Sequence, residues 1–168
     1  MPFSLYLMRH GIAEDFDPAS MKSDADRKLT KEGKDKLAEQ AKGVRALDLD
    51  LGLLVTSPFT RARQTAEIVA GALDAKLPLE IASELVPNAD PEQILEYLAA
   101  KKASAPTLLF GHEPHLSTLV SIVLSGKSEI AVEMKKGALV GLELMRLQPP
   151  FRGHLRFLIP PRALRGLH

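Results

Sequence analysis

Residues 5–11 read Leu-Tyr-Leu-Met-Arg-His-Gly, a short apolar run that ends on Arg9, His10 and Gly11. An apolar run of this length is typical of a β-strand that is buried on both faces. Histidine can act as a nucleophile, arginine is the best planar clamp for phosphate, and glycine lets a bulky anion approach the backbone. The stretch therefore predicts a buried strand with anion chemistry at its end, although a strand that ends in an ordinary polar turn would give the same tripeptide.

Two further apolar runs end in comparable polar residues. The run at 51–56 is followed by Ser57 and Pro58, and the run at 107–110 is followed by Gly111 and His112. Segments with helical periodicity separate these runs, so strands alternate with helices over most of the chain. This alternation predicts an α/β fold with a largely parallel sheet. Because neither a linker nor an internal repeat interrupts the pattern, we expect residues 1–168 to form a single domain.

The local patterns also predict where the elements begin and end. Strands are expected at about 4–8, 51–56, 79–81, 107–110, 129–134, 138–147 and 154–159. Helices are expected from about 31 to 47 with Thr30 as N-cap, from Pro58 to about 73 with Ser57 as N-cap, after Asp90, and from Pro114 to Gly126. The acidic segment 14–27 is expected to be a surface loop, and the tail from Pro160 is expected to fray.

The composition excludes several classes of protein. The chain has 168 residues, of which 45% are hydrophobic and 26% charged, as in an ordinary globular protein. Its net charge of +1 gives no strong attraction toward nucleic acid or a membrane. It contains no cysteine, so thiolate chemistry and cysteine-bound zinc are excluded and a reducing, cytoplasmic compartment is expected. The sequence pattern leads us to expect neither a signal peptide nor a transmembrane segment.

The polar strand ends predict a site for a phosphoryl group. In open α/β sheets ligands bind beyond the carboxyl ends of the strands, so Arg9, His10 and His112 should gather at one edge. Arg61 falls in the first turn of the second helix, where the helix dipole disfavours a cation unless an anion lies in front of it. Two cations and two imidazoles suit a phosphoryl group. A metal site is not expected, because two histidines without carboxylates at ligand spacing bind zinc poorly.

Three motifs together resemble the histidine phosphatase superfamily, which is also called phosphoglycerate mutase-like. They are Leu7-Met8-Arg9-His10-Gly11, Ser57-Pro58-Phe59-Thr60-Arg61-Ala62-Arg63-Gln64-Thr65-Ala66 and Gly111-His112-Glu113-Pro114. The short length, the Arg27-Lys28-Leu29-Thr30 segment and Ser57-Pro58-Phe59 most resemble the SixA-type phosphohistidine phosphatases. The resemblance implies a three-layer fold with helices on both faces of the sheet.

The resemblance also implies roles for the site residues. His10 would be the nucleophile and carry the phosphoryl group as a covalent phosphohistidine, which water then hydrolyses. Arg9, Arg61 and His112 would bind the phosphoryl oxygens and stabilise the charge of the transition state. Ser57 is expected to act mainly as a helix cap and secondarily as a phosphate contact. No metal or cofactor is expected.

The sequence departs from the family pattern at the general acid. Many members carry a carboxylate in a Leu-x-Glu pattern, where this chain has Leu85-Val86-Pro87. Glu84 is close to the expected position but out of register, and it remains a candidate proton donor. Glu14 and Asp90 are further candidates, each more readily explained as an exposed loop charge. We expect Glu113 and His115 to flank the site, with His115 on the surface, and we expect Arg63 on the surface too.

Three functions remain open at this point. The first is a phosphatase for phosphohistidine on a signalling protein, which needs no strong acid because imidazole is a good leaving group. The second is a phosphatase for small phosphomonoesters or for another phosphoprotein. The third is a catalytically weak module that only binds phosphorylated partners. The expected partner is accordingly a phosphohistidine-bearing protein or a small phosphoester, and neither nucleic acid nor a membrane.

Overall fold

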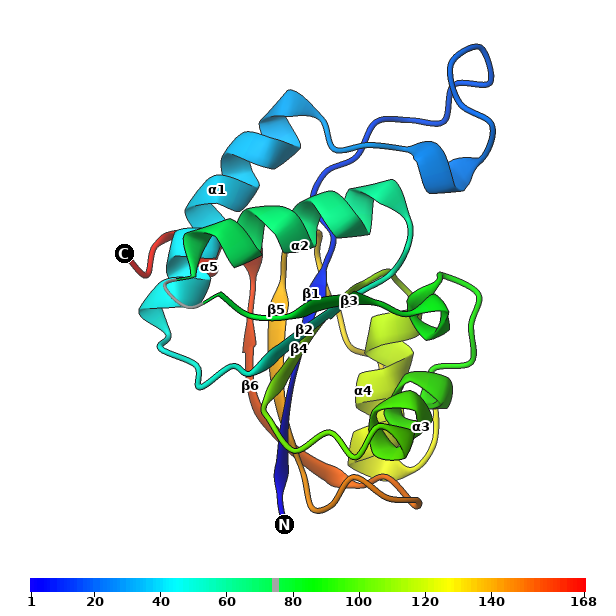
Figure 1. Ribbon diagram of the computed structural model, residues 1–168, viewed down its shortest axis with the longest axis vertical. Helices are drawn as coiled ribbons and strands as arrows, with labels where there is room; N and C mark the ends of the chain where they lie inside the picture. The colour runs from blue at the N-terminus through cyan, green and yellow to red at the C-terminus, as the bar shows by residue number, and fades with distance from the viewer. Residues whose placement is uncertain (74–75) are drawn as a thin grey trace.

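Six strands form one mixed sheet in the computed structural model, which describes residues 1–73 and 76–168 (Figure 1). In the order β3-β2-β4-β1-β5-β6, the first four strands run parallel and the last two are antiparallel to their neighbours. The strands are β1 (Phe3–Arg9), β2 (Leu53–Thr56), β3 (Leu79–Ile81), β4 (Thr107–Gly111), β5 (Leu139–Leu144) and β6 (Gly153–Ile159). The prediction of a largely parallel sheet is therefore confirmed.

Helices cover both faces of this sheet and give the three layers that the sequence predicted (Figure 1). They are α1 (Lys31–Ala46), α2 (Thr60–Ala72), α3 (Glu92–Ala100), α4 (His115–Ser125) and α5 (Pro161–Arg165), with 3₁₀ turns η1 (Asp24–Asp26) and η2 (Ser83–Leu85). Alternate side chains of β1 enter different cores, since Leu7 packs with α3 and α4 whereas Met8 packs with α1, α2 and α5. The strand is therefore buried on both faces, as its apolar run predicted.

The strand register brings three polar residues to one edge of the sheet. Arg9 of β1 lies opposite Gly111 of β4, and the backbone N–H of His10 donates to the carbonyl oxygen of Gly111 at 3.0 Å. In the same way the N–H of Ser57 donates to the carbonyl oxygen of Phe110 at 3.0 Å. The residues that follow β1, β2 and β4 therefore leave the sheet side by side.

The predicted helix caps are confirmed at two helices. The side chain of Thr30 accepts a hydrogen bond from the N–H of Gly33 at 2.9 Å and begins α1. Gly126 ends α4 with φ of 83°, a left-handed conformation that glycine adopts without a steric penalty. These ends are set by local chemistry, which explains why the sequence alone located them.

The start of α2 differs from the prediction. The helix begins at Thr60, so Ser57 is not its N-cap and Pro58 is not its first helical residue. The hydroxyl of Ser57 accepts a hydrogen bond from the N–H of Phe59 at 3.2 Å, within the turn that precedes the helix. Arg61 nevertheless lies in the first helical turn, as expected.

The segment 129–134 is not the strand that its composition predicted. The N–H of Ile130 donates to the hydroxyl of Ser121 at 2.9 Å, and the carbonyl of Met134 accepts from Arg9 at 2.9 Å. Side chains therefore satisfy these backbone groups in place of a neighbouring strand. The segment runs as a loop from α4 into the site and then to β5.

The chain after Pro160 is ordered as α5 and does not fray as predicted. Leu164 is fully buried in the same core as Leu37 and Val44 of α1. Gly43 allows this contact, because a Cβ atom at this position would overlap the backbone of Leu164. A helix of five residues has little stability alone, so packing against α1 is what holds it.

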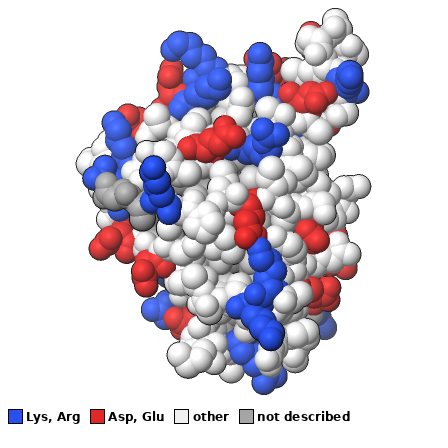
Figure 2. All heavy atoms as spheres, viewed as in Figure 1, with Lys and Arg blue, Asp and Glu red and all other residues white. Residues whose placement is uncertain are grey.

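Charged side chains of both signs are interspersed on the face shown in Figure 2. This distribution agrees with the net charge of +1. Among the described residues, no helix is both long and apolar enough to cross a lipid bilayer.

Candidate active site

His10 is held in one tautomer by its own backbone. The ring is buried, and its Nδ1 lies 2.7 Å from the carbonyl oxygen of Gly11. A carbonyl oxygen can only accept a hydrogen bond, so Nδ1 carries the proton and Nε2 has an unprotonated lone pair. The Nε–H of Arg61 donates to that Nε2 at 3.3 Å. The lone pair of His10 therefore faces a guanidinium group, which is where an oxyanion would bind.

Asp24 binds the other side of Arg61. The carboxylate of Asp24 forms a salt bridge with Nη2 of Arg61 at 3.0 Å, and its backbone carbonyl accepts from Nη1 at 2.9 Å. Arg27 also pairs with this carboxylate at 2.9 Å. Sequence reasoning assigned Asp24 to a surface loop and missed this contact, because no local pattern links residues 24 and 61.

His112 faces His10 across the edge of the sheet. The ring centroids are 5.2 Å apart with the planes at 55°, and Nε2 of His112 shares a hydrogen bond of 2.8 Å with the hydroxyl of Ser57. Its Nδ1 is buried and has no partner among the described residues. Phe59, which the sequence reasoning did not single out, packs edge-on against His112 at 5.2 Å and lies 5.2 Å from the guanidinium carbon of Arg61.

Arg9 is fixed by the loop that precedes β5. Its Nη1 donates to the carbonyl of Met134 at 2.9 Å, while its buried Nε has no partner among the described residues. The positive charge of Arg9 helps to lower the pKa of His10, and the charge of Arg61 helps to lower the pKa of Arg9. The carboxylate of Glu113 offsets part of that repulsion. Two cations whose charges interact in this way favour an anion between them.

Packing against α1 also favours glycine at position 11, and its predicted role in anion approach stays a prediction. A Cβ atom here would lie 2.5 Å from Cδ1 of Leu37 in α1. The N–H of Gly11 donates to the hydroxyl of Thr65 at 3.1 Å, and that hydroxyl donates to the carbonyl of Arg61 at 2.7 Å. Thr65 therefore ties the turn after His10 to the helix that carries Arg61, and it too escaped the sequence reasoning.

Burial controls the charge state of the site. The pKa of both His10 and His112 is lowered to about 3, with burial as the largest cause and nearby charged groups as a smaller one. Burial also lowers the pKa of Arg9 and Arg61. Hydrogen bonds and charge from Arg27 and Arg61 lower the pKa of Asp24, which is therefore an anion near neutral pH. Arg9, His10, Arg61 and His112, which we call the cluster, therefore combine two neutral imidazoles with two permanent cations.

The carboxylates proposed as proton donors lie outside this network. Glu84 is half-buried in η2, where its carboxylate accepts from the hydroxyl of Ser83 at 3.5 Å. Asp90 accepts from the N–H of Glu92 at the start of α3. Glu14 follows the isolated bridge formed by Ala13. Within the described residues, none of the three carboxylates hydrogen-bonds to His10 or His112.

His115 is buried, so the prediction of a surface position is wrong. Only 2% of its surface is exposed, and neither ring nitrogen has a hydrogen-bond partner among the described residues. Burial lowers its pKa. His115 is the first residue of α4, and its side chain is buried in the interior. Arg63, by contrast, is exposed as expected.

No group of three or more histidine, aspartate or glutamate side chains in the described parts of the chain is arranged to hold a metal ion. The four polar residues of the cluster are instead two arginines and two histidines. This set of donors matches the charge of a phosphoryl group and can bind its oxygens.

Comparison with known proteins gives concordant results. The model of the histidine phosphatase superfamily (branch 1) matches residues 5–86. The chain is 32% identical to the phosphohistidine phosphatase SixA of Escherichia coli over 126 residues, or 74% of this chain and 76% of SixA. It is 33% identical over 164 residues to an uncharacterized protein of Picosynechococcus sp., covering 95% of this chain and 98% of that protein.

A solved structure gives the same result at the level of the fold. The protein histidine phosphatase SixA complexed with tungstate superimposes with a TM-score of 0.81 at 27% sequence identity. The match covers 96% of this chain and 99% of that chain.

Proposed function

The chain belongs to the histidine phosphatase superfamily and is SixA-like, and from this we propose that it hydrolyses phosphohistidine on a protein through a covalent intermediate at His10. The superfamily assignment supports phosphatase activity that uses a histidine. The observation that carries the choice of His10 is its unprotonated Nε2, which accepts a hydrogen bond from the Nε–H of Arg61 at 3.3 Å and would exchange that bond for the phosphorus atom.

In the first step Nε2 of His10 attacks the phosphorus atom, and the bond from phosphorus to the substrate imidazole breaks. If the leaving imidazole carries a proton on its other nitrogen, it departs as a neutral molecule and needs no acid from the enzyme. Arg61, Arg9 and His112 would hold the three non-bridging oxygens and offset their charge. The neutral state of His10, which follows from its lowered pKa, keeps the nucleophile active near neutral pH.

In the second step water attacks the phosphorus atom of the phosphohistidine. The bond from phosphorus to Nε2 breaks, the lone pair returns to His10, and both protons of the water leave on the phosphate product. Transfer of this kind depends on positioning and charge stabilisation more than on covalent chemistry from the protein. The residues of the cluster supply both.

The choice of phosphohistidine over a phosphomonoester rests on the proton donor. Asp24 is a carboxylate that hydrogen-bonds to the cluster, and it is ionised and paired with Arg61. The carboxylate of Glu113 acts on Arg9 by its charge, and it accepts a hydrogen bond from the N–H of Ser117 at 2.9 Å. An alkoxide leaving group needs an acid, whereas a protonated imidazole does not. A cytoplasmic phosphoprotein is the partner that this proposal implies. Glu84 remains the candidate donor if an ester is the substrate.

Radiolabelled phosphoryl transfer tests the intermediate. We expect the protein to acquire an acid-labile label from N-phosphoimidazole, and we expect His10→Ala to acquire none. The control is His154→Ala, which removes an exposed histidine on β6 and should leave labelling unchanged. Labelling of His10→Ala at the wild-type level would exclude His10 as the nucleophile.

A substrate comparison tests the specificity. We expect kcat/KM to be higher for a phosphohistidine peptide than for p-nitrophenyl phosphate or sugar phosphates. Faster turnover of the esters would make the protein a phosphomonoesterase. Binding of the phosphopeptide without turnover or label would make it a binding module.

A further inference from the structure

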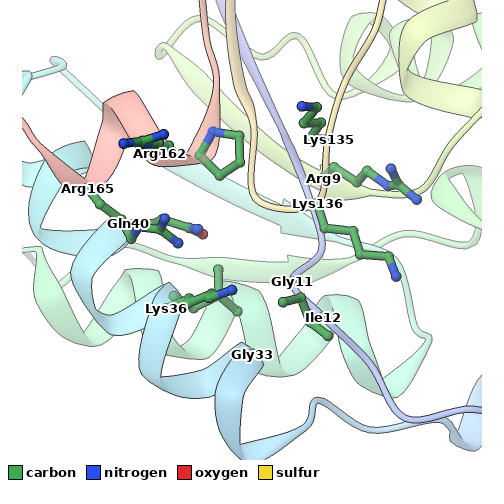
Figure 3. Close-up of a pocket in the computed structure, with 12 residues that line it drawn as sticks. Arg9, Gly11, Ile12, Gly33, Lys36, Gln40, Lys135, Lys136, Arg162 and Arg165 are labelled. Atoms are coloured by element: carbon green, nitrogen blue, oxygen red, sulfur yellow. The ribbon is translucent and has the colours of Figure 1, made fainter.

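A cationic pocket of about 390 Å³ lies between α1, α5 and the loop that precedes β5, beside the end of β1 (Figure 3). Among the described residues its lining contains no aspartate or glutamate. The six cations that line it come from four different segments of the chain and are Arg9, Lys36, Lys135, Lys136, Arg162 and Arg165. We call this the basic pocket.

Most of this positive charge is uncompensated. Lys36 pairs with Glu32 at 2.7 Å, and Arg9 donates to a backbone carbonyl. In the parts of the chain that the structure describes, the other four cations form no side-chain hydrogen bond or salt bridge. On the face shown in Figure 2 acidic and basic side chains are interspersed. The pocket is a local excess of positive charge on a chain whose net charge is only +1.

The basic pocket adjoins the candidate active site. Arg9 and Gly11 line the pocket and also flank His10 in the chain. In Figure 3 the side chains of Arg9 and Lys136 extend to the same side of β1, away from Arg162 and Arg165. The charge of Lys136 also reaches His10, whose pKa it helps to lower. A group in this pocket is therefore next to a phosphoryl group bound at His10.

Packing holds the walls of the pocket in place. Gly137 follows the two lysines with φ of 83°, and a Cβ atom there would overlap the amide of Gln40 in α1. The loop can thus approach α1 closely. On the other wall, Leu164 anchors α5 against α1 and so fixes the helix that carries the two arginines.

The lining indicates what kind of group would bind. It contains no aromatic side chain on which a nucleotide base could stack. Lys135, Lys136 and Arg162 are exposed, so their charged ends are mobile and can reach several separate anions. Carboxylates spaced along a protein surface suit such an arrangement better than one compact ligand does.

We propose that the basic pocket binds acidic side chains that flank the phosphohistidine on a phosphoprotein substrate. The inference rests on the proposed function and specifies its substrate class, a phosphohistidine with aspartates or glutamates beside it. Binding these carboxylates would position the phosphoryl group before attack and would raise the rate of association at low ionic strength.

Two phosphohistidine peptides test this inference, one with glutamates on both sides of the phosphohistidine and one with glutamines in their place. We expect kcat/KM of the wild-type protein to favour the acidic peptide by about tenfold, as expected for a few exposed charge pairs. The preference should decline as salt is added. In the double variant Lys135→Gln/Arg162→Gln it should fall to about twofold, with turnover of N-phosphoimidazole unchanged.

The control is Lys127→Gln/Arg146→Gln, which removes two exposed cations outside the pocket and should keep the full preference. Equal kcat/KM for the two peptides would overturn the inference while leaving the proposed function intact. Faster turnover of a small bisphosphate than of the acidic peptide would overturn it too. If N-phosphoimidazole and both peptides were all resistant, the proposed function and the inference would fail together.

Discussion

Arg61 contacts His10 through Nε and Asp24 through both Nη groups. This ion pair orients the guanidinium, yet the carboxylate also offers Arg61 an internal anion in competition with phosphate. The effect of Asp24 on anion binding is therefore a balance between orientation and competition, and the exposure of its side chain limits both.

We predict that Asp24→Asn tightens the binding of inorganic phosphate by about threefold, because a partly exposed charge pair is worth only a fraction of a kcal/mol to about 1 kcal/mol. The asparagine keeps the shape of the residue and the backbone carbonyl contact. Competitive inhibition by phosphate measures the effect. Asp35→Asn, which breaks the exposed pair of Asp35 with Lys31, should leave the inhibition constant unchanged. Weaker inhibition in Asp24→Asn would mean that orientation of Arg61 dominates.

Ser57 is the hydrogen-bond partner of His112 at 2.8 Å. Ser57→Ala would leave both ring nitrogens of this buried histidine unpaired, so we expect unfolding free energy to fall by about 1–3 kcal/mol. We also expect kcat to fall about tenfold as the ring loses its orientation. Chemical denaturation and steady-state kinetics measure the two effects.

Ser121→Ala is the matched control for Ser57→Ala. The hydroxyl of Ser121 bonds the carbonyl of Lys127 and the N–H of Ile130, away from the site. It should lower stability without changing kcat. If Ser57→Ala, like Ser121→Ala, lowered stability and left kcat unchanged, Ser57 would have no role in positioning His112.

At the scale of elements, the packing of α1 against the sheet determines the shape of the turn that holds His10. We predict that Gly11→Ala lowers stability by about 1–3 kcal/mol, because the added methyl group would overlap Cδ1 of Leu37. The double variant Gly11→Ala/Leu37→Ala should lose less than the sum of the two single variants. Urea denaturation of all four proteins measures this coupling, and strict additivity would contradict it.

The small helix α5 depends on its contact with α1. Leu164 is fully buried there, so Leu164→Ala should cost about 2–5 kcal/mol of unfolding free energy. Leu167, which is 43% exposed, provides the control, and its replacement by alanine should change stability by less than about 0.5 kcal/mol. Equal effects in denaturant titrations would show that α5 does not contribute to the core.

At the scale of the whole molecule, buried histidines link folding to pH. The pKa of His10 and of His112 is about 3 in the folded chain, and an unfolded histidine titrates near pH 6.5. Between these values only the unfolded chain takes up the protons. Stability is therefore fully present above pH 6.5 and is lost as pH falls toward 3.

We expect each such histidine to reduce unfolding free energy by about 1.4 kcal/mol per pH unit in this window. Urea titrations between pH 7 and pH 4 measure the slope. His10→Gln should reduce the slope by the contribution of one histidine, because His112 remains. His154→Gln, which changes an exposed histidine, should leave the slope unchanged. An unchanged slope in His10→Gln would mean that His10 titrates normally in the folded protein.

The sheet also explains how distant residues form one site. Parallel strands present their carboxyl ends at the same edge, and the register of β1 with β4 brings His10 and His112 within 5.2 Å between ring centroids. Net charge contributes little to substrate attraction at +1, so the basic pocket supplies the local field.

Local patterns in the sequence determined the alternation of strands and helices, the caps at Thr30 and Gly126, and the polar residues that end each strand. These features depend on residues that are close together in the chain, so the sequence alone is enough to predict them. The sequence also singled out Arg9, His10, Arg61 and His112, whose chemical roles stay predictions.

Only the tertiary structure decided the pairing of Asp24 with Arg61, the burial of His115, the docking of α5 and the loop at 129–134. It also decided which cations meet in the basic pocket. Each of these depends on contacts between residues far apart in the chain, where burial and packing outweigh local propensity. Leu164 illustrates this, because a helix of five residues is stable only where it packs closely, and Gly43 of α1 leaves the space for that contact.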